Sequence, residues 1–286
     1  MPFVFKKVLD HGTTNPIVAR LSLQVLKFLD QCDVTKDVRD KVGELYVNSL
    51  LRKLIRCWEI EQRFREEFNA AAAYNPPAGG QATQIPQVGR LEEECHNFLY
   101  EAKNYIRDLL EVVNLLYGTE FKEASEFSRA KKGRPSLVEW ASKTFGGEDP
   151  KTKFLQEAVA AVEHLIDARN AVEHPGGYSG TLRIDNFTLE ADGRLGEPVW
   201  HREKDGKAVD AVSSIRADMD AAIHNLLVLG EDVLVSWAAD HLKAPEFMRV
   251  AVVPLEGRDP KCPVKYVVTA SVELERKFAE AEKKGG

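Results

Sequence analysis

Residues 91–117 read LEEECHNFLYEAKNYIRDLLEVVNLLY, and this stretch decides the fold class of the chain. Its apolar side chains recur every three or four residues, at Phe98, Leu99, Ile106, Leu109, Leu110, Val113 and Leu116. This spacing places them on one face of a helix and leaves the charged residues on the other. A helix of this kind must bury its apolar face against other elements, so we expect a mainly α-helical bundle.

The residues before this helix predict a separate N-terminal helical region, residues 1–73. Residues 14–16 (TNP) predict a helix start, because a capping side chain precedes a proline at the first helical position. Thr35 is predicted to cap a second, longer helix that runs to the end of this region. Residues 74–90 contain prolines and glycines that cannot sustain a helix or strand pairing. We therefore interpret them as a linker and as the main domain boundary.

Three further helices are predicted beyond the long amphipathic one. Ser136 begins a capping-box pattern, which predicts a short helix. Asp149 caps a longer helix that ends near His174, because a proline and two glycines follow. Residues 209–242 carry the next periodic apolar pattern. We therefore expect a helical domain over residues 91–243.

Short strands are predicted to form two small β-hairpins that decorate the bundle. Alternating apolar residues and turn signals place these strands at residues 181–189, 198–204, 249–255 and 264–271. A charged terminal helix is predicted at residues 272–284. The second hairpin and this helix together form a C-terminal region, residues 244–286.

The composition is that of an ordinary globular protein. The 286 residues are 44% hydrophobic and 29% charged, which is enough to bury a sizeable core. The net charge is −6, whereas proteins that coat a nucleic-acid duplex are usually basic, because phosphate contacts dominate their affinity. Any nucleic-acid site must therefore be a local basic patch on an acidic surface.

The cysteines and the apolar segments predict a cytoplasmic protein. The cysteines are widely separated and form no CxxC pair, which argues against both a zinc ribbon and a disulfide scaffold. Met1 to Lys7 contain no long apolar run of the signal-peptide kind. No stretch approaches the length needed to span a bilayer, so we expect no membrane partner.

Most enzymatic signatures are missing from the sequence. It contains no phosphate-binding glycine loop, no dinucleotide-binding motif, no HExxH and no nucleophile elbow. Glu93 and His96 form one ExxH pair, whereas a di-iron centre in a four-helix bundle needs two such pairs and two further carboxylates. We interpret this pair as surface residues, and we expect neither a metal site nor a cofactor.

The chemically suggestive segment is residues 169–174 (RNAVEH), at the predicted end of a helix. Arg169 and Glu173 are four residues apart, as are Asn170 and His174, so the side chains occupy two neighbouring stripes. An arginine can bind a phosphate through two nitrogens, and a histidine can transfer protons near neutral pH. These residue types are the minimum set for phosphodiester chemistry. The structural alternative is that the two cations only stabilise the helix end through its dipole.

An Arg-Asn-x-x-x-His motif at the end of a bundle helix resembles that of the HEPN (higher eukaryotes and prokaryotes nucleotide-binding) domain. The resemblance covers about residues 91–242 and implies an HEPN-like up-and-down helical bundle. The family signature is an arginine followed by a histidine after four to six residues. Residues 90–96 and 194–201 also satisfy that loose spacing. Only residues 169–174 combine an asparagine after the arginine with the end of a periodic helix and a long helix that follows.

The resemblance implies a metal-independent RNA endonuclease. The ribose 2′-hydroxyl would attack the adjacent phosphorus, leaving a cyclic phosphate and a 5′-hydroxyl. Arg169 would bind the phosphate, His174 would act as general base or acid, and Asn170 would orient His174 or bind the phosphate. The motifs of two subunits meet in this family, so the resemblance implies a homodimer. It also implies a toxin or phage-defence system, with a regulatory or antitoxin partner.

Other functions stay open at this point. A dense basic run could guide an RNA backbone to the motif, although a solvated loop explains it equally well: Arg129, Lys131, Lys132 and Arg134. One alternative is a non-catalytic HEPN-like module that binds RNA, a nucleotide or a partner protein. Another is a helical dimerisation scaffold. Burial of Arg169 and His174 in a dry core would favour the scaffold, whereas a solvated cleft shared by two copies would favour the nuclease.

Overall fold

The computed structural model describes residues 10–73, 85–131, 133–190, 194–271 and 274, most of which are helical. The helices are α1 (Pro16–Val18), α2 (Val25–Gln31), α3 (Lys36–Leu45), α4 (Leu51–Ala72), α5 (Leu91–Tyr117), α6 (Leu137–Phe145), α7 (Pro150–Glu173) and α8 (Ile215–Asp240). Two π-helical segments, Ala19–Gln24 and Tyr46–Leu50, connect α1 to α2 and α3 to α4. Short 3₁₀ helices lie at Ala124–Phe127 and Leu255–Gly257. The prediction of a mainly α-helical protein is therefore confirmed.

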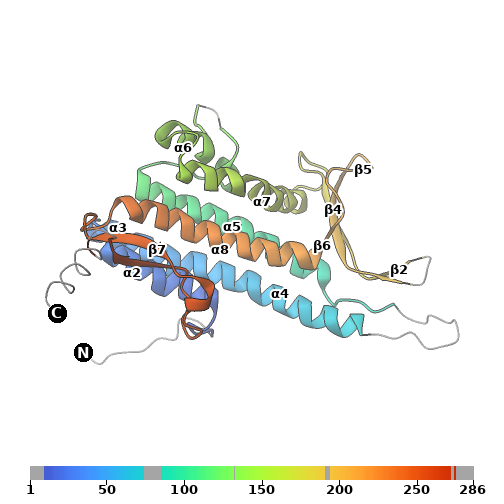
Figure 1. Ribbon diagram of the computed structural model, residues 1–286. Helices are drawn as coiled ribbons and strands as arrows, with labels where there is room; N and C mark the ends of the chain where they lie inside the picture. Colours follow the sequence, from blue (N-terminus) through green and yellow to red (C-terminus); the bar gives the residue numbers. More distant parts are fainter. Residues whose placement is uncertain (1–9, 74–84, 132, 191–193, 272–273, 275–286) are drawn as a thin grey trace, which may run out of the picture.

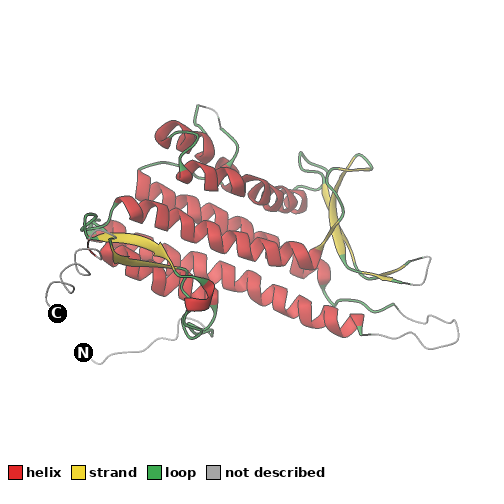
Figure 2. Cartoon of the chain, in the orientation of Figure 1, coloured by secondary structure: helices red, strands yellow, loops and turns green. Residues whose placement is uncertain are grey.

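The centre of the molecule is a layer of three long helices, α4, α5 and α8, which lie side by side (Figure 1). Helix α7 packs on α5 and α8, and α6 packs on α7. The helices at the start of the chain pack around one end of this layer. Figure 2 shows that the strands lie outside the helical bundle. The end of α7 leads directly into the largest group of strands, which positions the candidate site at the edge of the bundle.

The helix starts follow the capping chemistry of the sequence. The predicted capping side chains all accept a hydrogen bond from the first turn of their helices: Asn15, Thr35, Ser136 and Asp149. Helix α5 has the predicted bounds. The helix predicted over residues 209–242 begins only at Ile215, because Ser214 caps it and residues 213–214 form a strand instead.

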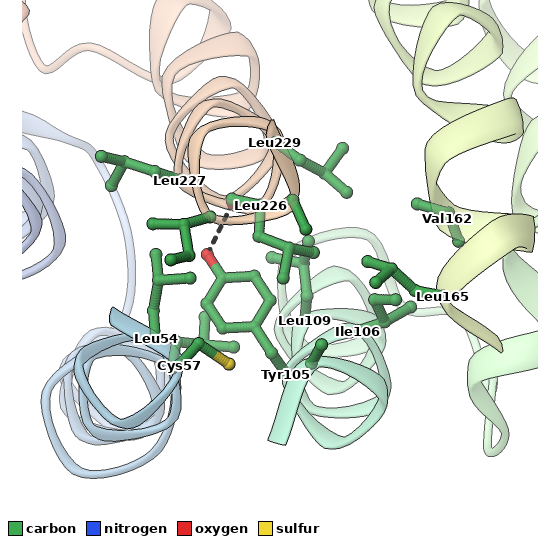
Figure 3. Close-up of a cluster of buried hydrophobic side chains, with 14 of the residues drawn as sticks. Leu54, Cys57, Tyr105, Ile106, Leu109, Val162, Leu165, Leu226, Leu227 and Leu229 are labelled. Carbon is green, nitrogen blue, oxygen red and sulfur yellow. Dashed lines mark hydrogen bonds between the residues drawn. The ribbon is translucent and has the colours of Figure 1, made fainter. Parts of the chain in front are cut away.

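One hydrophobic core contains residues from both sides of the predicted linker. Figure 3 shows Tyr105 of α5 between α4 and α8, with its hydroxyl donating a hydrogen bond to the carbonyl oxygen of Leu226 at 2.9 Å. Gly230 allows this close approach, since a Cβ atom there would overlap the Tyr105 hydroxyl. The boundary predicted at residues 74–90 therefore does not separate two packed units; residues 74–84 of it lie outside the described residues.

A charged cluster is buried in the middle of this core. Arg20, in the first π-helical segment, forms two hydrogen bonds to the carboxylate of Glu231 on α8, one of them 2.6 Å long from Nε to Oε1. Gln24 donates to the same carboxylate at 2.9 Å, and its own oxygen accepts the backbone N–H groups of Lys265 and Tyr266 at 2.8 Å. This cluster therefore joins the first helices, α8 and the C-terminal hairpin.

The first predicted hairpin is a larger β structure. Strand β1 (Thr181–Asp185) pairs antiparallel with β4 (Val199–Lys204), and β4 also pairs with β5 (Lys207–Ala208) and β6 (Ser213–Ser214). The strand predicted over residues 181–189 is interrupted at Asn186, whose side chain forms two 2.9 Å hydrogen bonds to the backbone of Val88. Beyond it, β2 (Thr188–Leu189) pairs with β3 (Leu195–Gly196) in a separate ribbon.

The second predicted hairpin is confirmed. Strand β7 (Met248–Val252) pairs antiparallel with β8 (Tyr266–Ala270). The helix predicted over residues 272–284 lies outside the described residues, apart from Leu274.

The expectation that no stretch approaches the length of a membrane span was wrong, because helix α8 is long and apolar enough, by length and composition alone, to cross a membrane. It lies in the central layer of the bundle, and 61% of its most apolar window is buried by the rest of the chain. The core helix of a water-soluble protein has the same length and composition, so α8 is explained by its packing.

Candidate functional site

The candidate site is built on the last turns of α7. The helix ends because the chain leaves helical geometry at His174, whose backbone N–H still bonds the carbonyl of Asn170 at 2.9 Å. Gly177 then donates to the carbonyl of His174 at 2.9 Å, which forms a tight turn. Gly180 has a positive φ of 82°, and a Cβ atom there would lie 2.5 Å from the carbonyl oxygen of Glu203. This turn therefore holds the exposed side chain of His174 at a defined helix end.

Arg169 lies one turn earlier, and its side chain is only 14% exposed. Its Nη2 lies 3.2 Å from the Glu173 carboxylate, and its guanidinium carbon lies 5.4 Å from the centre of the Tyr100 ring on α5. Its Nε is buried and has no hydrogen-bond partner among the described residues. The guanidinium is therefore fixed in place while part of its donor capacity is unused.

Helix α5 contributes a residue that the sequence analysis did not identify. Lys103 Nζ donates to Asn170 Oδ1 at 2.9 Å and to Glu173 Oε2 at 2.6 Å. Burial alone would raise the pKa of the Glu173 carboxyl, but its hydrogen bond to Lys103 and the charges of Lys103 and Arg169 hold that pKa below its usual value. Three of the motif side chains are thus held against α5, and His174 is exposed beside them.

A stripe of three α5 residues faces the motif. His96, Tyr100 and Lys103 are separated by four and three residues, so they share one side of the helix. Burial lowers the pKa of the His96 imidazole and the charge of Arg169 lowers it further, against the opposing charge of Glu92. The spacing of these residues was visible in the sequence, but their position opposite Arg169 depends on how two helices pack.

A groove of about 740 Å³ adjoins this stripe through His96. It lies between the start of α5 and the β structure, and it is lined by Val88, Arg90, Leu91, Glu92, Glu93, His96, Asn97, Ile184 and Asn186. Two carboxylates and one arginine line it, so its charge does not favour a phosphate.

The turn after His174 is fixed by a buried charge network around Asp167. Arg129 donates to both oxygens of the Asp167 carboxylate, at 2.9 and 2.8 Å, and Ser179 donates at 3.2 Å. Arg202 of β4 lies 3.5 Å from the same carboxylate. Burial alone would raise the pKa of the Asp167 carboxyl, but the hydrogen bonds from Arg129 and Ser179 and the two arginine charges lower it.

We expect Asp167→Asn to lower the free energy of unfolding at pH 7 by roughly 1–3 kcal/mol, because hydrogen bonds between charged groups are lost. The folded-state pKa of Asp167 is depressed, so this stabilisation is present above its unfolded-state pKa of about 4 and is lost as the pH falls through the folded-state value. Denaturant unfolding of both proteins at pH 7 and at about pH 3 measures the difference. An equal difference at both values of pH would contradict the assignment.

The basic run is placed beside this network. Arg129 is paired with Asp167, and Arg134 Nη2 lies 3.0 Å from Glu126 while its Nη1 donates to the carbonyl of Glu120. Lys131 is exposed, and Lys132 lies outside the described residues. Since two of these cations are neutralised by carboxylates of the chain, the run presents less positive potential than its sequence suggests.

The other two loose arginine–histidine spacings do not form comparable sites. Arg90 is ion-paired with Glu93 at the start of α5. His201 lies on β4, where its Nδ1 is buried without a partner among the described residues. His96, in contrast, belongs to the stripe that faces Arg169.

Within the described residues, no group of three or more histidine, cysteine, aspartate or glutamate side chains could hold a metal ion. The ExxH pair of Glu93 and His96 therefore belongs to no such group among the described residues. Comparisons with known protein families, with curated proteins and with solved structures found no match. The geometry at the end of α7 is therefore what bears on the function of the chain.

Proposed function

We propose that the chain is a metal-independent RNA endonuclease of the HEPN type. The observation that carries this proposal is that an exposed imidazole, His174, lies five residues after a guanidinium, Arg169, that Glu173 and Tyr100 hold in place at the same helix end. A planar guanidinium suits a phosphate, because it can donate two parallel hydrogen bonds to the phosphate oxygens. His174 is exposed, whereas the Arg169 side chain is only 14% exposed and its Nε is buried, so His174 is the residue that departs from the dry core of a purely structural role.

The proposed reaction needs one proton removed and one proton supplied. The ribose 2′-oxygen attacks phosphorus as its proton passes to a general base, the bond from phosphorus to the 5′-oxygen breaks, and a general acid protonates that oxygen. His174 serves as one of these two groups, and Arg169 stabilises the charge on the phosphate oxygens. Asn170 orients His174 or hydrogen-bonds the phosphate, and its side-chain oxygen accepts a hydrogen bond from Lys103 at 2.9 Å.

We propose that a second copy of the chain supplies the other proton-transfer group, since one His174 cannot be base and acid in the same step. Light scattering should then give twice the 32.0 kDa mass of the chain at micromolar concentration. A clean monomer that cleaves RNA would contradict the two-copy site.

The proposed function is tested by incubating the purified protein with a defined single-stranded RNA in excess EDTA. We expect cleavage to continue and to produce fragments with cyclic phosphate and 5′-hydroxyl ends, because Arg169 and His174 supply the charge stabilisation and the proton transfer. Mass spectrometry identifies both ends. Cleavage that stops in EDTA and returns with magnesium would show that another mechanism operates.

One observation favours a second candidate, a non-catalytic module that binds RNA or a nucleotide. Glu173 pairs with both Arg169 and Lys103, so the site is partly occupied by a carboxylate of its own chain. A binding module predicts RNA binding without cleavage under any of these conditions. The same incubation, followed by an electrophoretic binding assay, separates the two functions.

A further inference from the structure

Lys103 is a cation beside the motif that contacts two of its side chains. Its Nζ lies 2.9 Å from Asn170 and 2.6 Å from Glu173, and its side chain is 24% exposed. It comes from α5, whereas every residue that it contacts in the motif comes from α7. It therefore adds a positive charge to the site that the Arg-Asn-x-x-x-His pattern does not contain.

Glu173 bridges the two cations. Its Oε2 accepts from Lys103, and its Oε1 lies 3.2 Å from Arg169 Nη2. A carboxylate that spans two cations in this way occupies the position in which two oxygens of a phosphate would be bound. Glu173 is the last residue of α7, and its side chain is 32% exposed, so it can turn into solvent without disturbing the core.

We propose that Lys103 is a second phosphate-binding residue of this site, and that the Glu173 carboxylate holds the phosphate position in the free protein. The inference rests on the proposed function, because it assigns the same site an RNA backbone as its ligand. When the Glu173 side chain turns into solvent, Asn170 still accepts a hydrogen bond from Lys103. This bond keeps the Lys103 ammonium group beside Arg169. Two adjacent cations then face one anion.

The test measures binding of a fluorescent single-stranded oligodeoxynucleotide, which lacks the 2′-hydroxyl and therefore stays intact. We expect Lys103→Met to weaken binding roughly tenfold and to reduce the slope of log affinity against log salt by about 0.7, the value for one lost phosphate contact on a single strand. Lys103→Arg should keep the slope. A residue that only stabilised the fold would leave the slope unchanged.

Glu173→Gln should tighten binding about threefold to fivefold, because a neutral amide competes less well for two cations. This gain should shrink in the Lys103→Met background, since the two side chains act on one position. Glu94→Gln is the matched control: Glu94 pairs with Arg63 at 2.8 Å between α4 and α5, so the charge change is the same and the site is untouched. Thermal melts confirm that each variant is folded.

An unchanged salt slope in Lys103→Met, or an equal gain from Glu94→Gln and Glu173→Gln, would overturn the inference. So would a wild-type protein that does not bind the oligonucleotide. These outcomes are independent of the cleavage assay, because the probe cannot be cut by the proposed reaction. A protein that cleaves RNA but shows no Lys103 effect retains the proposed function and loses only this inference.

Discussion

His174→Ala and Arg169→Ala should each reduce RNA cleavage by at least about a hundredfold while the protein remains folded. General acid–base catalysis typically contributes about 10²–10⁴ in rate, and the loss of one donor to a developing oxyanion costs about 10²–10³. His174 is exposed, so its loss should lower the free energy of unfolding by about 1 kcal/mol or less. The Arg169 side chain is only 14% exposed, so its removal also loses packing and should cost roughly 1–3 kcal/mol. Gel assays and thermal melts measure the two effects separately.

The controls follow from the position of the other histidines. His224→Ala removes an exposed helical histidine on α8 and should leave cleavage at the wild-type rate. His201→Ala should also leave cleavage at the wild-type rate, because Arg194 and His201 match only the loose arginine–histidine spacing. His96 is unsuitable as a neutral control, because the charge of Arg169 helps to lower the pKa of its imidazole. If a folded His174→Ala protein cleaves RNA at the wild-type rate, the motif does not take part in the reaction.

Glu231→Ala should lower the free energy of unfolding by about 3–5 kcal/mol, because it leaves the Arg20 guanidinium buried without its counter-charge. The Arg20 side chain is 9% exposed, so water cannot replace the carboxylate. For a protein of this size such a loss corresponds to a fall in Tm on the order of 10 °C. Differential scanning calorimetry of both proteins measures it.

The double variant Arg20→Met, Glu231→Leu distinguishes two costs. One is the cost of leaving Arg20 buried without a counter-charge, and the other is the loss of the ion pair itself. Replacing both charges by apolar side chains of similar size is often neutral or stabilising, so we expect the double variant to recover most of the lost stability. A double variant as unstable as Glu231→Ala would mean that Gln24, which also bonds this carboxylate, depends on it more strongly than Arg20 does.

The elements that could be predicted from the sequence are those fixed by neighbouring residues. The caps at Asn15, Thr35, Ser136 and Asp149 bond groups two or three residues away. Helix α5 could be predicted to the residue because its apolar period is strong and Gly118 follows with a positive φ of 67°. The end of α7 at His174 followed from the proline and glycines after it.

The interactions that could not be predicted join residues far apart in the sequence. Lys103 reaches Asn170 across 67 positions, and Arg20 reaches Glu231 across 211. Which charged side chain faces a motif depends on the rotation and crossing of two helices, and no short pattern encodes either. The same reason applies to the predicted domain boundary. Proline and glycine mark a break in the helix, but they do not determine which elements the flanking segments pack against.

Helix α8 lies at the centre of the bundle although it is synthesised after α4, α5 and α7. The apolar faces of α4, α5 and α7 that it covers therefore have no permanent partner until about residue 240 has left the ribosome. At about 5–20 residues per second, the interval after α5 is complete lasts on the order of ten seconds. A nascent chain exposed for that time needs protection from aggregation, and a chain truncated before Ile215 lacks the middle of its core rather than an edge.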